Sequence, residues 1–221
     1  MLHQIKIDAV IFDMDGILID SEPLWKEAEK QVLASYNIDS TIQARLLDTR
    51  GLRVDEVVRL WIQAASKTGL ELTQLIEQVH LTAKSLIEKN KPALPGVEHA
   101  LELCKSHGLK IGLVSASPQK IIDDALSSLG ITHYFDAVVS SENMVNCKPH
   151  PEVYLETANL LDVSALSCVA IEDSVDGMIA CKAARMRSIV VTPEKGFNDP
   201  RFGLADFHLT SLLDLSKKHF S

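Results

Sequence analysis

Two carboxylates, Asp13 and Asp15, stand two residues apart at the end of the apolar run Ala9–Phe12, and Gly16 follows them. The apolar run predicts a buried strand, and the glycine allows the backbone to turn after it. Folding alone does not require carboxylates at the buried end of a strand, because charge there is costly unless a cation or hydrogen bonds offset it. The pair therefore predicts a chemical site with a bound cation.

Two other interpretations of this pair are a solvated acidic turn and a calcium loop. An EF-hand loop that begins at Asp13 needs an oxygen ligand at position 17 and a glutamate at position 24, where the chain has Ile17 and Leu24. The spacing therefore excludes the EF-hand, and the solvated turn stays open.

The composition narrows the class of protein. With 221 residues, of which 46% are hydrophobic, the chain can form one large domain or one domain that carries an insertion. The formal net charge of −8 argues against nucleic-acid and anionic-membrane partners, which would be repelled at long range. Aspartates interrupt the apolar N-terminal stretch, so it predicts neither a signal sequence nor a membrane span. We expect a cytoplasmic monomer.

The cysteines and histidines predict no metal site. Cys104, Cys147, Cys168 and Cys181 show no CxxC spacing, and most lie within apolar patterns, so they are predicted to be reduced and mostly buried thiols. Cys147 alone, beside Lys148, is expected to be accessible. The eight histidines form no HxxxH or HExxH pair.

Two different patterns divide the chain. From Glu22 to about Asn90 apolar residues recur at helical spacing, and Lys91–Gly96, with two prolines and a glycine, then ends the helical stretch. Beyond it, apolar strands and amphipathic helices alternate. The predicted helices are Val97–His107, a helix with Pro118 in its first turn behind Ser117, Pro151–Leu161 and Ser174–Ala184. The predicted strands are Ala9–Phe12, Ile111–Val114, Ala137–Val139, Cys168–Ile171 and Ser188–Val191.

This order of elements predicts an α/β fold: a doubly wound parallel sheet with a Rossmann-like core and an inserted helical cap domain. Strands in such alternation pair in parallel, lie under helices on both faces and are joined by right-handed crossovers. The core is expected to comprise residues 1–16 and 93–221, and the cap residues 17–92.

Polar residues follow four of the predicted strands. In open parallel sheets ligands bind outside the carboxyl ends of the strands, so these residues should converge on one crevice. They are Asp13 with Asp15, Ser115 with Ser117, Lys148, and Glu172 with Asp173. Each has a structural alternative: the serines or Asp173 would cap the next helix, and Lys148 would be a solvated loop residue. Their coincidence at four successive strand ends favours a site.

The residue types suit phosphoryl transfer. A carboxylate with an acid/base partner two residues on can attack phosphorus and form an aspartyl-phosphate that water then hydrolyses. A carboxylate and a phosphate repel each other by about 4 kcal/mol for each charge pair at about 4 Å, with an effective dielectric constant of about 20, so a divalent cation must cancel the charge. Mg²⁺ accepts oxygen ligands, which Asp13, the backbone carbonyl of Asp15 and Asp173 would supply, with Glu172 as an outer-shell acid.

Two further strand-end groups would bind the phosphate itself. Lys148 and Ser115 are the candidates to hold phosphate oxygens and to counter the charge that develops during transfer. No GxxxxGK[ST] sequence occurs, which disfavours nucleotide hydrolysis by a P-loop.

Four segments, in their order along the chain, resemble the signature motifs of the haloacid dehalogenase superfamily. They are DMDGILIDSEP from Asp13, VSASP around Ser115, KPHPE from Lys148 and IEDSVDG around Asp173. The whole chain is similar to the β-phosphoglucomutase-like subgroup, whose members carry a helical cap.

This resemblance implies a role for each matched residue. Asp13 would be the nucleophile and Asp15 the general acid/base, which favours phosphoryl transfer because a dehalogenase does not need the second aspartate as an acid. The implied substrate contacts are Asp13, Met14, Asp15, Ser115, Ala116 and Lys148. The implied Mg²⁺ ligands are Asp13, Asp15 and Asp173, with Glu172 as a further candidate.

The predicted function is Mg²⁺-dependent hydrolysis of the phosphate monoesters of small sugars or sugar alcohols, hexoses or hexitols, through an aspartyl-phosphate. One alternative is a sugar-phosphate mutase. Mutases similar to this subgroup carry a histidine near the place where this chain has Trp25, and an indole cannot bridge charges to the acid/base group. The other alternative is a non-catalytic phosphosugar-binding protein, against which the nucleophile, lysine and metal positions are all filled.

Substrate choice is expected to lie in the cap, which can close over the strand ends and exclude water. Arg45, Arg50 and Arg53 flank Gly51 between predicted cap helices. Arg53 or one of its neighbours is expected to meet substrate hydroxyls or phosphate, and solvated charges at helix ends are the alternative.

Overall fold

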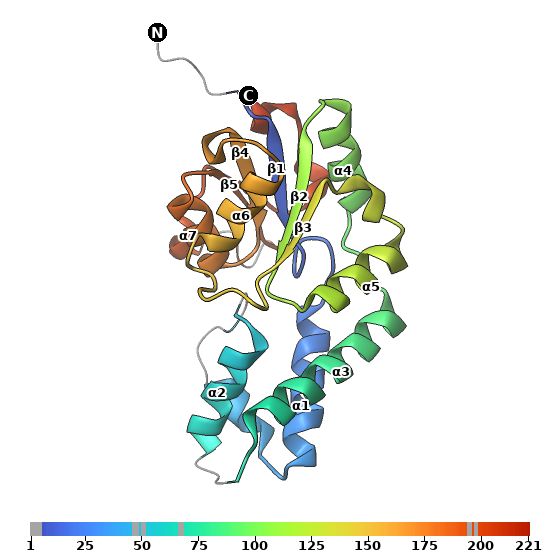
Figure 1. The fold of residues 1–221 in the computed structure, drawn as a ribbon, viewed down its shortest axis with the longest axis vertical. Coiled ribbons are helices and arrows are strands. Elements are labelled where there is room, and N and C mark those ends of the chain that lie inside the picture. The colour runs from blue at the N-terminus through green and yellow to red at the C-terminus, as the bar shows by residue number, and fades with distance from the viewer. Residues whose placement is uncertain (1–5, 46–48, 50–51, 66–68, 194–195, 197–198) are drawn as a thin grey trace.

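The centre of the fold is one sheet of six parallel strands in the order β3-β2-β1-β4-β5-β6 (Figure 1). The computed structural model describes residues 6–45, 49, 52–65, 69–193, 196 and 199–221. The strands are β1 Ala9–Asp13, β2 Lys110–Ser115, β3 Ala137–Ser140, β4 Cys168–Glu172, β5 Arg187–Val191 and β6 Phe207–Leu209. The order reverses between β1 and β4, which confirms the predicted doubly wound parallel sheet.

The five strands that the sequence predicts are present, each within one residue of its predicted bounds. The sixth strand, β6, was not predicted because its three residues are too few to show an alternating pattern. It extends the sheet by pairing with β5 alone. Short 3₁₀ turns complete the core at Thr132–Tyr134, Ala165–Ser167, Pro200–Phe202, Leu212–Asp214 and Lys217–Phe220.

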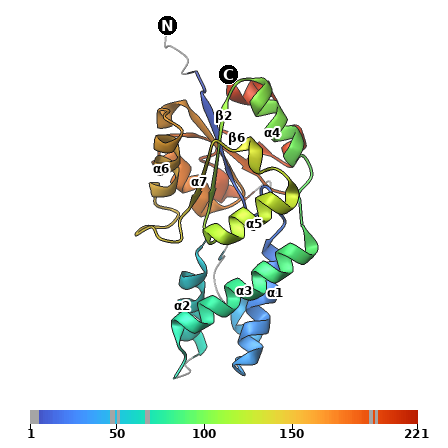
Figure 2. The same ribbon diagram turned by 45° about the vertical axis from the view of Figure 1, so that its right-hand side comes forward.

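Helices cover both faces of the sheet, as Figure 2 shows. They are α4 Val97–Ser106, α5 Gln119–Leu129, α6 Glu152–Leu160 and α7 Val175–Ala183. Val10 and Phe12 of β1 lie in the apolar cluster under α4 and α5, whereas Ala9 and Ile11 lie in the cluster under α6 and α7. Successive strand residues point to opposite faces, so a central strand between two helix layers is buried throughout.

The described residues between β1 and α4 form a helical layer with a core of its own. Its elements are α1 Glu22–Ser35, a 3₁₀ turn Ser40–Arg45, α2 Val54–Ala65 and α3 Leu72–Asn90. Trp61, Leu75 and Val79 are buried at its centre. Figure 1 shows this layer below the carboxyl ends of the strands, where a cap would cover a ligand. Among the described residues, no helix has the length and apolar character needed to span a membrane.

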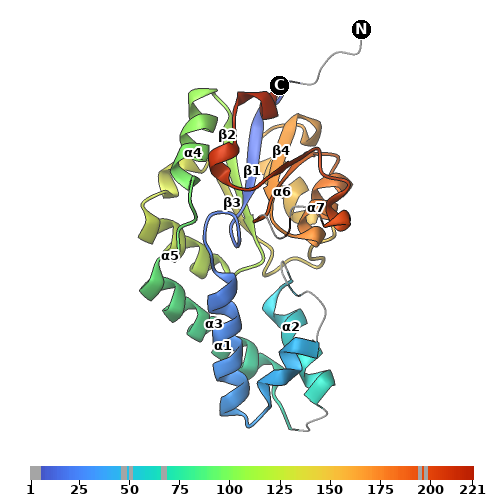
Figure 3. The same ribbon diagram turned by 180° about the vertical axis from the view of Figure 1, so that it is seen from behind.

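Two chain segments join the cap to the sheet, and they lie side by side. The Asp20 N–H donates to the Pro92 carbonyl at 2.7 Å, and the Leu94 N–H donates to the Leu18 carbonyl at 3.0 Å. Figure 3 shows the first segment in blue, leading from β1 into α1. Residues 17–19 pack in the large apolar cluster of the core, so the chain leaves the core only after Asp20. The boundaries of the two domains stay a prediction.

Helix α5 begins one residue later than predicted. Pro118 has an extended ψ of 143° and is the N-cap residue, so the first helical residue is Gln119. An N-cap residue lies outside the helical conformation, which explains why a proline in this place does not enter the first turn. No side chain caps this helix, and the Ser117 hydroxyl therefore has a different partner.

Candidate active site

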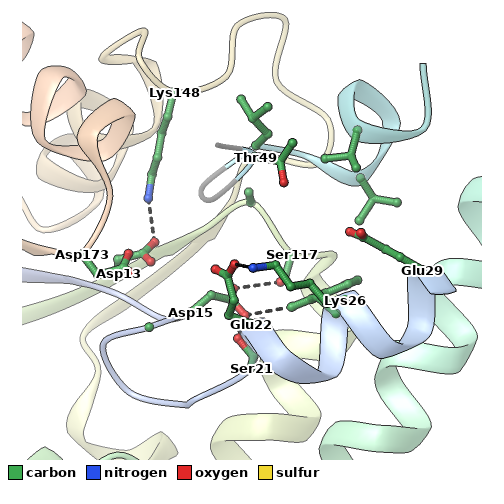
Figure 4. A pocket seen from close by; sticks show the side chains of 16 residues that line it. Asp13, Asp15, Ser21, Glu22, Lys26, Glu29, Thr49, Ser117, Lys148 and Asp173 are labelled. Atoms are coloured by element: carbon green, nitrogen blue, oxygen red, sulfur yellow. Dashed lines mark hydrogen bonds and ion pairs between the residues drawn. The ribbon is translucent and has the colours of Figure 1, made fainter. Parts of the chain in front are cut away.

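The strand-end residues meet in one pocket between the carboxyl edge of the sheet and the cap (Figure 4). The core lines it with Asp13, Asp15, Gly16, Ala116, Ser117, Lys148 and Asp173. The segment that includes the cap lines it with Ser21, Glu22, Trp25, Lys26, Glu29, Thr49, Leu52, Val54 and Val57. Asp13 ends β1 and Asp173 follows β4, the two strands between which the order reverses, and this is where ligands bind in doubly wound folds.

Lys148 is buried and not a solvated loop residue. Its Nζ lies 2.6 Å from Oδ1 of Asp13 and 2.6 Å from Oε1 of Glu172. Burial lowers the pKa of this ammonium, but the two carboxylates outweigh burial and hold the pKa above its ordinary value. The lysine therefore stays charged beside the carboxylate that ends β1.

Asp13 lies in a strongly negative environment. Burial raises the pKa of its carboxyl well above the ordinary value, although the Lys148 ammonium lowers it. The carboxylates of Glu172, Asp15 and Asp173 raise this pKa further. Among the charges that act on Asp13, the Lys148 ammonium is thus opposed by three further carboxylates, and a second source of positive charge would keep Asp13 ionised.

The acidic residues are arranged as a divalent cation would need them. One carboxylate oxygen from each of Asp13, Glu172 and Asp173 lies within 4.8 Å of the others. An all-oxygen donor set of this charge fits a hard divalent cation. Both oxygens of Glu172 already accept hydrogen bonds, from Lys148 on one side and from the Ser174 hydroxyl on the other, so Asp13 and Asp173 are the better direct ligands.

The Asp15 carboxylate points away from this cluster and accepts four hydrogen bonds. Its Oδ1 accepts from the Ser21 hydroxyl at 2.5 Å and from the Trp25 indole N–H at 3.1 Å. Its Oδ2 accepts from the hydroxyls of Ser115 and Ser117 at 2.9 and 3.0 Å. Three of the four partners are hydroxyls, which can also accept, so the same surroundings can hold Asp15 as a base or as an acid.

The other predicted substrate contacts lie at the rim or below it. Ala116 lines the pocket. The side chain of Met14 is buried in the large apolar cluster, so only its backbone is placed to meet a ligand. Ser115 is buried, and its hydroxyl donates to Asp15. Its contact with phosphate therefore stays a prediction.

Comparison with known proteins agrees with this geometry. Residues 10–191, which include every predicted catalytic and metal-binding residue, match the family model described as haloacid dehalogenase-like hydrolase. The chain belongs to the haloacid dehalogenase-like hydrolases. It is therefore an enzyme, and its core is Rossmann-like. Hydrolases of this family generally use a divalent metal.

Relatives of two activities resemble the chain over nearly its whole length. Hexitol phosphatase B of Escherichia coli is 51% identical over 213 residues, which are 96% of this chain and 96% of that protein. β-Phosphoglucomutase of Bacillus subtilis is 32% identical, with 94% of this chain and 91% of that protein covered. A crystal structure of β-phosphoglucomutase from Clostridium difficile has a TM-score of 0.82 at 29% identity and covers 96% of this chain and 95% of that one.

A buried tyrosine supports the site of this hydrolase, and sequence reasoning missed it. The Tyr154 hydroxyl donates to Oε1 of Glu172, the same oxygen that accepts from Lys148. The Lys148 Nζ also lies 5.4 Å from the centre of the Tyr154 ring. The only sequence signal is the position of Tyr154 six residues after Lys148, on the first turn of α6.

Arg53 does not line the pocket. Its guanidinium instead donates to backbone carbonyls of the loop that follows β3, so Arg53 is not a solvated helix-end charge, and a contact with substrate stays a prediction. The other two arginines of that prediction are outside what the structure describes, Arg50 entirely and Arg45 in its side chain.

Replacing Gly16 by alanine is expected to displace Asp173, a predicted metal ligand. Gly16 has a φ of +80°, and a Cβ at this position would lie 2.2 Å from Oδ2 of Asp173. We expect Gly16→Ala to weaken divalent-cation binding by at least about 10-fold, the cost of disturbing an orienting contact. Calorimetric titration with Mg²⁺ and Mn²⁺ measures the change.

Gly130→Ala is the matched control for this variant. Gly130 has a similar φ of +71°, but a Cβ there meets nothing within 4 Å. Both alanines should cost about 1–2 kcal/mol of folding free energy because of the left-handed backbone, and only Gly16→Ala should weaken cation binding. Equal cation affinity in the two variants would show that Gly16 does not make room for the ligand.

Proposed function

We propose that this hydrolase is a Mg²⁺-dependent phosphatase that acts on phosphate monoesters of small sugars or sugar alcohols, such as hexoses and hexitols. The observation that carries the proposal is the pair at the end of β1: Asp13 held at 2.6 Å by the buried Lys148, and Asp15 held apart from it by four donors. The 51% identity to a protein named hexitol phosphatase B supports the same substrate class.

The first half of the reaction transfers the phosphoryl group to Asp13. A carboxylate oxygen of Asp13 attacks phosphorus, the bond from phosphorus to the sugar oxygen breaks, and Asp15 as acid gives a proton to the leaving oxygen. In the second half Asp15 as base takes a proton from water, the water oxygen attacks phosphorus, and the bond to Asp13 breaks. Inorganic phosphate and the free carboxylate of Asp13 result.

Positive charge in the site would offset the repulsion between the phosphate and the Asp13 carboxylate. Mg²⁺ held by Asp13, Asp173 and the backbone carbonyl of Asp15 would supply positive charge against the phosphate. Lys148 is charged and already contacts Asp13, so it would hold a phosphate oxygen while the phosphoryl group moves from the sugar oxygen to Asp13. Glu172 keeps that lysine in place through its 2.6 Å contact.

The cap side of the pocket offers partners for a polyol. Glu22, Lys26 and Glu29 of α1 line the pocket at spacings of four and three residues, which place them on one face of the helix. Opposite charges and hydrogen-bonding groups of this kind suit hydroxyls better than a hydrocarbon or a second phosphate. Leu52, Val54 and Val57 add an apolar part to this wall. Hexitol phosphates and 2-deoxyglucose 6-phosphate are the substrates we expect.

A sugar-phosphate mutase of the β-phosphoglucomutase type is the second candidate, because the 32% identical relative carries that name. A mutase returns the phosphoryl group to the sugar. Its aspartyl-phosphate must therefore be protected from water while the sugar reorients in the pocket. Trp25 reaches Asp15 as a neutral donor and brings no charge from the cap to the acid/base group. We therefore favour hydrolysis. A non-catalytic phosphosugar-binding protein is disfavoured because the nucleophile, the lysine and the metal ligands are all present.

A product assay separates the candidates. The chain is incubated with Mg²⁺ and a panel that includes sorbitol 6-phosphate, 2-deoxyglucose 6-phosphate and β-glucose 1-phosphate. We expect inorganic phosphate to appear in step with the loss of substrate. An isomeric sugar phosphate without phosphate release would establish the mutase, and binding without turnover would establish the non-catalytic alternative.

Chelation is the control for the role of the cation. Because Lys148 alone does not balance the carboxylates that surround Asp13, EDTA should stop phosphate release and added Mg²⁺ should restore it. Turnover that is indifferent to EDTA would contradict the Mg²⁺ dependence while leaving the substrate assignment intact.

A further inference from the structure

Arg53 joins the cap to the core through backbone carbonyls. Its Nη1 lies 2.8 Å from the carbonyl oxygen of Met144, 3.1 Å from that of Ser141 and 3.5 Å from that of Glu142. On the other side, Asp55 of α2 accepts from Nε at 2.9 Å and from Nη2 at 3.3 Å. The guanidinium thus binds a cap carboxylate through Nε and Nη2 and the core carbonyls through Nη1.

The loop that Arg53 contacts is the loop that carries the catalytic lysine. It runs from Ser141, after β3, to Pro151, before α6, and it includes Lys148. The Ser141 N–H donates to the Ser115 carbonyl at 2.9 Å, which ties the start of the loop to the end of β2. One arginine therefore connects a cap helix to the segment that positions Lys148 against Asp13.

We propose that Arg53 is a positioning residue, which latches the closed cap onto the loop 141–151 and so couples closure of the cap to the placement of Lys148. A guanidinium suits this task because it is always charged and presents several N–H donors in a fixed plane. Carbonyl oxygens on a loop are satisfied by water when a cap opens, so the contact can form and break with each turnover.

The geometry separates this role from substrate recognition. Arg53 is absent from the pocket wall, and its guanidinium donates to the loop carbonyls and to the Asp55 carboxylate. A latch acts on the enzyme and not on the leaving group. Its loss should therefore lower turnover of every phosphate ester by the same factor, whatever alcohol the ester carries.

Cys147 is a reporter of the latch that is already part of the chain. It precedes Lys148 in the loop and is half-buried, whereas Cys104, Cys168 and Cys181 are buried. Burial and the Glu56 carboxylate of α2 raise the pKa of its thiol to about 11, and the Arg53 guanidinium lowers it. Removing Arg53 would by this charge effect slow alkylation of the thiol, so faster alkylation can come only from greater exposure.

The first measurement is the rate at which iodoacetamide labels Cys147, followed by mass spectrometry of the full chain. We expect Arg53→Ala to raise this rate by at least about 5-fold, because the loop opens more often without the latch. Arg59→Ala is the matched control: Arg59 lies in α2, the helix that begins directly after Arg53, and it pairs with the same Asp55 at 3.7 Å, but no hydrogen bond or ion pair joins it to the described loop 141–151. Its labelling rate should equal that of the wild type.

The second measurement is turnover, and this part rests on the proposed phosphatase function. We expect Arg53→Ala to lower kcat/KM about 10- to 100-fold for sorbitol 6-phosphate, glycerol 3-phosphate and para-nitrophenyl phosphate alike. Arg53→Lys, which keeps the charge and loses the planar fork, should fall between Arg53→Ala and the wild type in both measurements.

Two results would overturn the latch. A Cys147 labelling rate in Arg53→Ala equal to that in Arg59→Ala would show that Arg53 does not hold the loop, and this readout needs no turnover. A loss of kcat/KM confined to the sugar phosphates would make Arg53 a substrate contact. Absence of phosphatase activity in the wild type would contradict the proposed function, and the labelling experiment would still decide the latch.

Discussion

Asp13→Asn is expected to lose at least about 10⁴-fold in kcat, the scale of losing a nucleophile. The amide keeps the shape of the side chain and an oxygen for Lys148, which lies 2.6 Å away, but it has no ionised oxygen to attack phosphorus. Folding should be preserved, since the change removes one of four carboxylates that crowd the site. Phosphate release measures the activity, and thermal unfolding measures the fold.

Asp8→Asn is the matched control for this prediction. Asp8 directly precedes the same strand, β1, at its amino end, and it pairs with Lys6 at 3.1 Å on the surface. The same chemical change there should leave kcat unchanged. If Asp13→Asn retained wild-type turnover, or if a phosphoryl group trapped during turnover were found on another residue, Asp13 would not be the nucleophile.

The sequence predicts those parts of the site that depend on strand ends. Asp13 and Asp173 follow apolar runs that form β1 and β4, and neighbouring parallel strands bring their carboxyl ends together without further information. Lys148 was predicted for the same reason, although it stands eight residues beyond β3. Its burial between two carboxylates depends on tertiary contacts with β1 and β4, which the sequence of the loop does not predict.

The contacts that sequence reasoning missed lie where two parts of the chain meet. Trp25 reads as one apolar residue of a cap helix, and its bond to Asp15 exists only because the cap sits over the strand ends. Arg53 reads as a helix-end charge, and its carbonyl partners lie about 90 residues further on in the chain. Tyr154 follows the apolar pattern of α6, and only packing against the sheet brings its hydroxyl to Glu172. Local periodicity carries no signal for contacts of this separation.

Lys148→Met is expected to lose both turnover and stability. Methionine fills a similar volume but leaves Asp13 and Glu172 buried without their shared cation. Removing one partner of a buried ion pair costs about 3–5 kcal/mol, because the remaining charge has lost its compensation. Turnover should fall by about 10³-fold or more with the loss of a cation that stabilises the transferring phosphoryl group. Urea unfolding and phosphate release measure the two effects.

Lys182→Met separates burial from ion pairing as the cause of that loss of stability. Lys182 lies as close to Asp206, at 2.6 Å, as Lys148 lies to its partners, but about a third of each of these side chains is exposed. Exposed pairs contribute at most about 1 kcal/mol, so Lys182→Met should be nearly neutral. An equal cost for the two methionine variants would mean that the surroundings of Lys148 do not matter.

Removing a second charge should return stability without returning activity. In Lys148→Met with Glu172→Gln, the new amide keeps an oxygen for the Ser174 hydroxyl and turns its NH₂ group toward Tyr154, whose hydroxyl can accept. One buried carboxylate is then neutral, and most of the lost free energy of unfolding should be recovered. The double variant should keep the loss of turnover of Lys148→Met, because Asp13 has no ammonium beside it. Recovery of turnover would show that Lys148 serves only to neutralise Glu172, and failure to recover stability would show that the lysine stabilises the fold by packing and not by charge.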